Sequence, residues 1–162
     1  MLPPFTPDGL LPLGSHDLTF SDLRASFLIA GQETFSQNWD SKWRSQLVDN
    51  LEVLVNQLWG VGITEIIIDG SFVEEKDHPN DIDGYFVCDV TDYDRVVKEL
   101  GRMDPFIWDW NIHDIKGHEK FNMWHVLKVE LYIVIRQAPN DMPSFFRATR
   151  DGRIKGVVNI IK

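Results

Sequence analysis

The stretch from Ile68 to Asp83 (IDGSFVEEKDHPNDID) holds the residues whose types and spacing could do chemistry. An apolar, β-branched segment ends at Gly70-Ser71, and an Asp-x-Asp pair opens the next such segment. Glycine lets the backbone pass close to a ligand, and the free amide groups at the start of a helix bind phosphate. Gly70 and Ser71 are therefore predicted to form an anion cradle.

The acidic pair is Asp81 and Asp83. Side chains two positions apart on a strand point to the same side, about 6 to 7 Å from each other along the chain. Hard carboxylate oxygens in that arrangement suit Mg²⁺, and Mn²⁺ is an alternative. The pair is therefore a candidate metal site that would share its ion with phosphate oxygens of a substrate.

A third carboxylate is expected from a neighbouring strand, and Glu130 is the best candidate. It interrupts the apolar run from Val126 to Ile135, where a buried charge needs a partner or a metal. Lys128 is expected on the same face of that strand. It would either pair with Glu130 or neutralise a phosphate.

Elements that position these residues can be read from the hydrophobic pattern. Apolar residues recur at spacings of three and four between residues 38 and 59, which predicts a helix that packs on the core. Strands are expected over 64–69, 81–90 and 125–135, and further helices over 92–100 and from Thr19 or Ser21 to Ala30. Asp151-Gly152 predicts a late hairpin.

The fold class that follows is a mixed α/β, or α+β, domain with helices packed on a mixed sheet. The 162 residues suit one domain. Its first 18 residues carry four prolines and two glycines, so they are expected to form an extended arm lying on the domain.

Composition narrows the function classes. The net charge of -9 argues against a surface that wraps DNA, and no apolar run reaches the roughly 20 residues that span a bilayer. A start without a signal-peptide pattern and the single Cys88 favour a cytoplasmic location. The basic run from Arg147 to Lys162 is either a solvated tail or a contact for phosphate or a partner.

The pattern of Gly70-Ser71, a spacer and Asp81-x-Asp83 resembles the nucleotidyltransferase superfamily of DNA polymerase beta. MLPPF at the start, IDGSF, PNDID and the closing GxxKGVV are similar to short microbial nucleotidyltransferase-like proteins. The resemblance implies a minimal nucleotidyltransferase fold, with Gly70 and Ser71 on the triphosphate and Asp81, Asp83 and Glu130 on Mg²⁺. It implies transfer of a nucleoside monophosphate from an NTP to a protein or RNA hydroxyl, in a toxin-antitoxin or defence system.

Two other functions stay open. The acidic spacer (Glu74, Glu75 and Asp77) and the lack of room for a nucleotide-recognition domain favour a catalytically silent module that binds a nucleotide or a protein partner. In a plain interaction protein, by contrast, the acidic pair would lie in an exposed turn, and Asp83-Gly84 is a strong turn signal.

Other chemistries fit less well. A calcium loop would need ligands where Pro79 and Val90 stand, and Ser71 lacks the flanking glycines of a hydrolase elbow. The five-residue spacing of His113 and His118 matches no zinc signature, so both are expected in a polar loop. The nearby tryptophans are expected in the core, with base stacking as the alternative. They are Trp108, Trp110 and Trp124.

Overall fold

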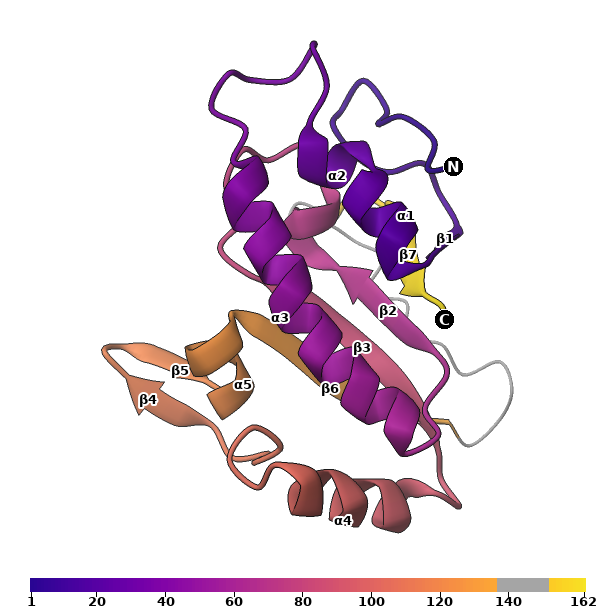
Figure 1. The fold of residues 1–162 in the computed structure, drawn as a ribbon, viewed down its shortest axis with the longest axis vertical. Coiled ribbons are helices and arrows are strands. Elements are labelled where there is room, and N and C mark those ends of the chain that lie inside the picture. Colours follow the sequence, from indigo (N-terminus) through magenta and orange to yellow (C-terminus); the bar gives the residue numbers. More distant parts are fainter. Residues whose placement is uncertain (137–151) are drawn as a thin grey trace.

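The computed structural model describes residues 1–136 and 152–162, and Figure 1 draws the remainder as a thin trace. Two predictions fall wholly or partly outside the described residues. One is the hairpin at Asp151-Gly152, and the other is the part of the basic run that holds Arg147 and Arg150.

A five-stranded mixed sheet forms the centre of the structure, in the order β1-β7-β2-β3-β6. β1 is parallel to β7 and β3 is parallel to β6, whereas β2 is antiparallel to both β3 and β7. Helices pack on this sheet, which confirms the predicted α+β class. The strands are β1 (Ser15–Leu18), β2 (Ile66–Asp69), β3 (Ile82–Asp89), β6 (Val129–Arg136) and β7 (Val157–Ile160).

The long helix α3 (Ser41–Gly60) lies across one face of the sheet, as Figure 1 shows. Its start is fixed by Asp40, whose carboxylate accepts a hydrogen bond from the amide of Trp43 at 2.9 Å. The predicted helix over 38–59 is confirmed. The apolar residues that recur along it are fully buried against the sheet, namely Leu47, Leu51, Leu54 and Leu58.

The N-terminal segment lies on the domain, because Leu2, Leu10 and Leu11 are buried. The extended arm is shorter than the predicted 1–18, since its last four residues form β1. Thr19 caps the next helix as predicted, in a reciprocal capping box with Asp22. That helix does not run unbroken to residue 30: an extended residue at Ser26 divides it into α1 (Phe20–Ala25) and α2 (Phe27–Ala30).

Between β3 and β6 the chain forms α4 (Tyr93–Met103), a two-stranded hairpin and α5 (Asn122–Leu127). The hairpin consists of β4 (His113–Ile115) and β5 (His118–Lys120), which turn at Lys116 and Gly117, both with positive φ. The expectation of a strand over 125–135 is wrong in its first part. Residues up to Leu127 are helical, and Lys128 adopts the left-handed conformation that ends α5 before β6 begins.

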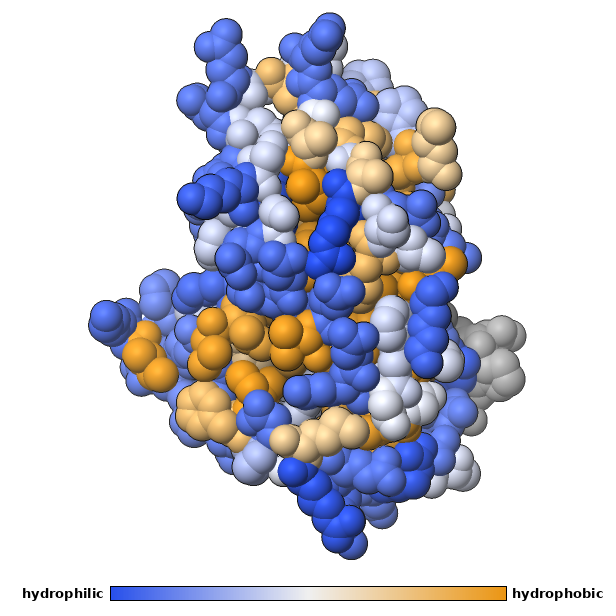
Figure 2. All heavy atoms as spheres, viewed as in Figure 1, coloured by the Kyte–Doolittle hydropathy of each residue, from blue (hydrophilic) through white to orange (hydrophobic). Residues whose placement is uncertain are grey.

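The face that carries α3 is mostly polar, but apolar side chains gather where α3 and α5 meet (Figure 2). Val53 on α3 and Val126 on α5 are each about half exposed. A hydrogen bond of 2.8 Å from the Asn50 side chain to the Leu127 carbonyl joins the two helices there. Among the described residues, no helix has both the length and the apolarity to cross a bilayer.

Candidate functional site

Three carboxylates lie side by side across the sheet. Asp69 at the end of β2 pairs in register with Asp83 on β3, and Asp83 pairs with Glu130 on β6. Residues directly opposite each other on adjacent strands point to the same face. We call Asp69, Asp83 and Glu130 the carboxylate row.

The row lies on the sheet face turned away from α3. Its sequence neighbours Ile68, Ile82 and Leu131 belong to the main hydrophobic core with α3, and side chains alternate along a strand. The structure thus brings Asp83 and Glu130 together as predicted. It also adds Asp69, which sequence reasoning quoted in the motif without giving it a role.

Asp81 lies just before β3 and flanks the row. Its Oδ2 accepts a hydrogen bond of 2.7 Å from the indole nitrogen of Trp124 on α5. The negative charge of Asp81 also contributes to raising the pKa of Asp83. The two members of the predicted pair thus interact electrostatically, although only the second belongs to the strand.

The negative charges of the carboxylate row are only partly compensated by nearby cations, as the raised pKa of Asp83 shows. Burial, followed by the charge of Asp81, raises the pKa of Asp83 to about 6, with smaller contributions from Glu130 and Asp69. Lys120 acts in the opposite direction. A carboxylate in this condition is stabilised by any additional cation that reaches it.

Glu130 is 2% exposed and already has partners. The ammonium of Lys120 on β5 lies 3.0 Å from its Oε1, and the hydroxyl of Tyr132 donates a short hydrogen bond to the same oxygen. Burial and this hydrogen bond raise the pKa of Tyr132 far above its usual range, so the phenol stays protonated. The expectation that Glu130 needs a partner is met by side chains from the hairpin and from its own strand.

Lys128 is not on the face of β6 that carries Glu130, so this part of the prediction is wrong. The residue precedes the strand, and its positive φ turns the chain from α5 into β6. Its ammonium lies 3.6 Å from the ring centre of Trp124, a cation-π contact. The two residues nevertheless place a cation beside the indole that binds Asp81.

Gly70 begins a single 3-10 turn, η1 (Gly70–Val73), rather than an α-helix. Its φ is +71°, and a Cβ at this position would lie 2.8 Å from Oδ2 of Asp83. Only glycine therefore lets the backbone pass so close to the carboxylate row. Ser71, the second residue of the predicted cradle, follows in the same turn.

Lys155 holds this turn. It lies in the basic run and is the lysine of the closing GxxKGVV segment, but no sequence signal indicated a role for it beside Asp69 and Gly70. The side chain is 2% exposed, and its ammonium lies 3.1 Å from Oδ1 of Asp69 and 2.9 Å from the carbonyl oxygen of Gly70. Glu74 supplies a third acceptor through a short ion pair. Burial raises the pKa of Asp69, and Lys155 opposes that shift.

Arg44 on α3 anchors the spacer between Gly70 and Asp81. Its buried guanidinium donates to the carbonyl oxygens of Leu28, Phe72, Glu74 and Lys76, at 2.6 to 3.2 Å. Burial lowers the pKa of Arg44 to about 10. The spacer is thus tied to the core through its backbone.

Gly84 shows why the acidic pair does not form an exposed turn. It lies inside β3, paired with Ile68 and Leu131, and a Cβ there would be 2.3 Å from the carbonyl oxygen of Ile67. The interpretation of Asp83-Gly84 as a hairpin turn is wrong. The position has no room for a side chain.

The donors in the row are carboxylate oxygens, the ligands that Mg²⁺ and Mn²⁺ prefer, so the chemistry of the set fits a hard cation. Within residues 1–136 and 152–162, however, no three acidic, histidine or cysteine side chains already converge as a metal site. A metal would therefore require these side chains to rearrange, since Lys120 at present contacts Oε1 of Glu130 and Trp124 contacts Oδ2 of Asp81.

The two histidines predicted in a polar loop instead lie in the β4–β5 hairpin. Nε2 of His113 lies 2.8 Å from Oδ2 of Asp109, whereas the ring of His118 lies 5.2 Å from that of Trp124. Trp108 belongs to the core as expected, packed edge-on against Phe86.

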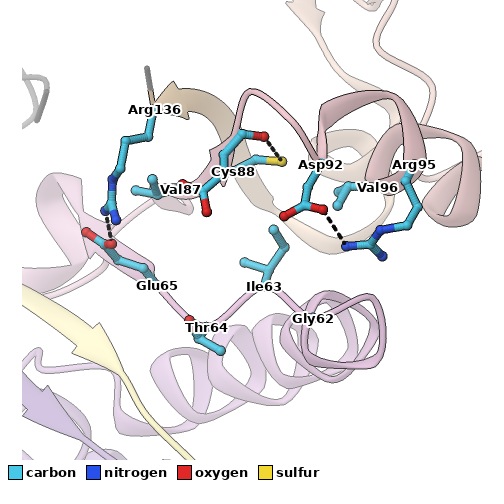
Figure 3. A pocket seen from close by; sticks show the side chains of 11 residues that line it. Gly62, Ile63, Thr64, Glu65, Val87, Cys88, Asp92, Arg95, Val96 and Arg136 are labelled. Atoms are coloured by element: carbon cyan, nitrogen blue, oxygen red, sulfur yellow. Dashed lines mark hydrogen bonds and ion pairs between the residues drawn. The ribbon is translucent and has the colours of Figure 1, made fainter. Parts of the chain in front are cut away.

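A separate pocket opens at the other end of β3, between the start of β2 and α4 (Figure 3). Both of its arginines are engaged: Arg136 pairs with Glu65, and Arg95 pairs with Asp92. Cys88 points toward it, but burial raises the pKa of the thiol and its Sγ contacts the carbonyl of Asp89. We assign this pocket no chemistry.

The chain was compared with known families, curated proteins and solved structures. No curated protein and no solved structure matches the chain. A family model described as a family of unknown function, DUF6932, matches residues 3–161. The chain, with its carboxylate row beside Gly70, therefore belongs to the DUF6932 family.

Proposed function

We propose that this protein is a metal-dependent nucleotidyltransferase that moves a nucleoside monophosphate from an NTP to a hydroxyl group on a protein or RNA. The observation that carries the proposal is the alignment of Asp69, Asp83 and Glu130 in one register beside the close-packed Gly70. Carboxylates gathered at the end of a strand can hold the metal ions that phosphoryl transfer uses.

Each residue has a role in this proposal. Asp81 and Asp83 would hold Mg²⁺ or Mn²⁺, with Glu130 as the third ligand, and the turn at Gly70 and Ser71 would receive the triphosphate. The acceptor hydroxyl oxygen would form a bond to the α-phosphorus while the bond to pyrophosphate breaks. A bound ion would supply charge stabilisation for the pyrophosphate leaving group and would lower the pKa of the attacking hydroxyl, whose proton would pass to solvent.

A second candidate is a catalytically silent module of the same fold that binds a nucleotide or a protein partner. The ion pair between Lys120 and Glu130 favours it, because Glu130 is already neutralised within the chain. The acidic spacer residues Glu74, Glu75 and Asp77 also disfavour a triphosphate through charge repulsion. Toxin-antitoxin or defence pairing is one setting for either candidate.

Thermal unfolding with and without Mg²⁺ and each NTP tests the proposal first. A ligand that binds only the folded state stabilises it by about 2.7 kcal/mol at a hundredfold excess over its Kd. We expect a magnesium-dependent rise in Tm with one NTP, and its loss in Asp81→Asn/Asp83→Asn. The matched control is Asp89→Asn/Asp94→Asn, which removes two exposed carboxylates from the end of β3 and from α4.

Transfer itself is tested by mass spectrometry of candidate proteins and RNAs incubated with NTP and Mg²⁺. The expected product carries the mass of one nucleoside monophosphate and is absent with Asp81→Ala/Asp83→Ala. Transfer that survives this double substitution contradicts the assigned roles. A nucleotide-dependent rise in Tm without transfer to any acceptor supports the silent module instead.

A further inference from the structure

The hairpin β4–β5 brings positive charge to the carboxylate row. Lys120, the last residue of β5, reaches Glu130 from outside the sheet, with 3.0 Å between Nζ and Oε1. The side chain of Lys120 is 31% exposed, whereas that of Glu130 is 3% exposed. The Glu130 carboxylate is thus fixed within the sheet, whereas the Lys120 ammonium lies nearer the surface, on the β4–β5 hairpin.

A second cation lies in the same neighbourhood. The ammonium groups of Lys120 and Lys128 lie 5.7 Å and 3.6 Å from the ring centre of Trp124, and that indole donates to Asp81. Both lysines therefore contact the ring of Trp124, and the same indole binds Asp81, one of the acids proposed to hold the metal. Phosphate binding needs such cations. The cation at the Gly70 turn, Lys155, is buried and engaged by Asp69, Glu74 and the Gly70 carbonyl oxygen.

We propose that Lys120 is an exchangeable counter-ion: it neutralises Glu130 while the site holds no metal, and it contacts the triphosphate, together with Lys128, once a metal-NTP complex binds. This inference rests on the proposed function and adds the parts of the chain that receive the nucleotide phosphates. The hairpin would then serve in place of a separate recognition domain.

The physical reason for the exchange is charge balance. A divalent ion bound to Asp81, Asp83 and Glu130 removes the need for the ammonium beside Glu130, because the two cations compete for one carboxylate. The triphosphate brings new negative charge to the same place, and an ammonium on a flexible stem can follow it. Lys120 is partly exposed and lies outside the hydrophobic core, so it can leave Glu130 without unpacking that core.

The experiment measures Mn²⁺ binding by calorimetry in wild type, Lys120→Met and Lys120→Gln, with and without a non-hydrolysable NTP. Lys98→Met is the matched control, since it removes an exposed lysine from α4. Lys120→Gln keeps a donor for Glu130 and guards against loss of folding, which is checked by the melting temperature of each variant. We expect both Lys120 variants to bind Mn²⁺ alone about tenfold more tightly, and the metal-NTP complex about tenfold more weakly, than wild type.

The outcomes separate this inference from the proposed function. If Mn²⁺ binds wild type in a manner that Asp83→Asn abolishes, but the Lys120 variants bind it no more tightly, the counter-ion role is refuted and the metal site stands. Tighter Mn²⁺ binding with unchanged nucleotide affinity refutes the contact with the triphosphate. If Mn²⁺ does not bind wild type, both proposals fail.

Discussion

Asp69 and Asp83 occupy directly opposed positions on β2 and β3, yet their surroundings differ. Asp69 has the buried ammonium of Lys155 at 3.1 Å, whereas the pKa of Asp83 is raised to about 6 by burial and by neighbouring carboxylates. Lys155 is thus a permanent internal cation that partly offsets the burial raising the pKa of Asp69. Asp83 has no such internal partner among its described contacts, and a bound metal ion would stabilise its charge.

The raised pKa of Asp83 predicts a specific dependence of stability on pH in metal-free protein. The ordinary pKa is 3.8 and the folded value is about 6, so the folded state binds this proton more tightly than the unfolded state. The contribution of the group to stability is complete below the ordinary pKa and is lost as the pH rises through the folded value. Asp83→Asn should therefore gain up to about 3 kcal/mol relative to wild type between about pH 4 and pH 7.

Urea unfolding in the presence of a chelator, at several pH values, measures that difference. Asp94→Asn, which removes an exposed carboxylate on α4, is the control and should show a flat difference across the same range. A relative stability of Asp83→Asn that does not change with pH would show that Asp83 titrates normally.

Gly70→Ala should be more harmful than an alanine at another glycine with positive φ. Gly117 has a φ of +80° and open space around it, whereas a Cβ at Gly70 meets Asp83 at 2.8 Å. We expect Gly117→Ala to cost about 1 kcal/mol from backbone strain alone, and Gly70→Ala about 2 to 4 kcal/mol. Equal losses in chemical denaturation would mean that close packing against Asp83 contributes nothing.

Lys155→Met should destabilise the protein by about 3 to 5 kcal/mol, because it leaves the buried carboxylate of Asp69 without its cation. Adding Asp69→Asn removes the uncompensated charge and should restore part of the loss. The coupling is obtained from a double-mutant cycle of unfolding free energies. Additive effects of the two substitutions would contradict a direct ion pair.

Arg44→Lys should cost about 2 to 4 kcal/mol although it keeps the charge. The guanidinium satisfies four carbonyl oxygens, and an ammonium with three hydrogens on a differently shaped stem cannot reproduce that set. Arg24→Lys is the matched control, since Arg24 forms partly exposed ion pairs with Asp49 and Glu52 and should lose less than about 1 kcal/mol. Similar losses in urea titrations of the two variants would argue against the anchoring of the spacer by Arg44.

Local patterns predicted the elements on which the candidate site is built. Two patterns predict their elements clearly: the β-branched run before Asp69 and the three- and four-residue spacing along α3. Each is clear because the element buries a continuous apolar surface. The interruption of an apolar run by Glu130 correctly singles it out as the carboxylate that joins Asp83 from the neighbouring strand, whereas strand alternation was applied to Asp81 and Asp83, of which only Asp83 lies in β3. The register that makes Asp83 and Glu130 neighbours is a property of strand pairing, which no local pattern specifies.

The failures have tertiary causes. His125, Val126 and Leu127 read as the start of a strand, but they are helical because Lys128 reverses the chain and Trp124 is fixed by Asp81. Lys155 is far from Asp69 in the sequence, so nothing near either residue revealed the contact. A buried lysine or arginine looks like any surface cation until its acceptors are known.

The position of β7 also governs how the molecule can assemble. β7 lies between β1 and β2, so β1 has no partner in the described sheet until the chain has been synthesised as far as Ile160. Pairings between such distant segments slow folding, because the chain loses the entropy of closing the loop before any stabilising contact between the strands forms. On the ribosome, β2 and β3 can pair early, whereas β1 must wait. A nascent chain held before residue 157 should therefore leave the N-terminal segment open to proteases or chaperones.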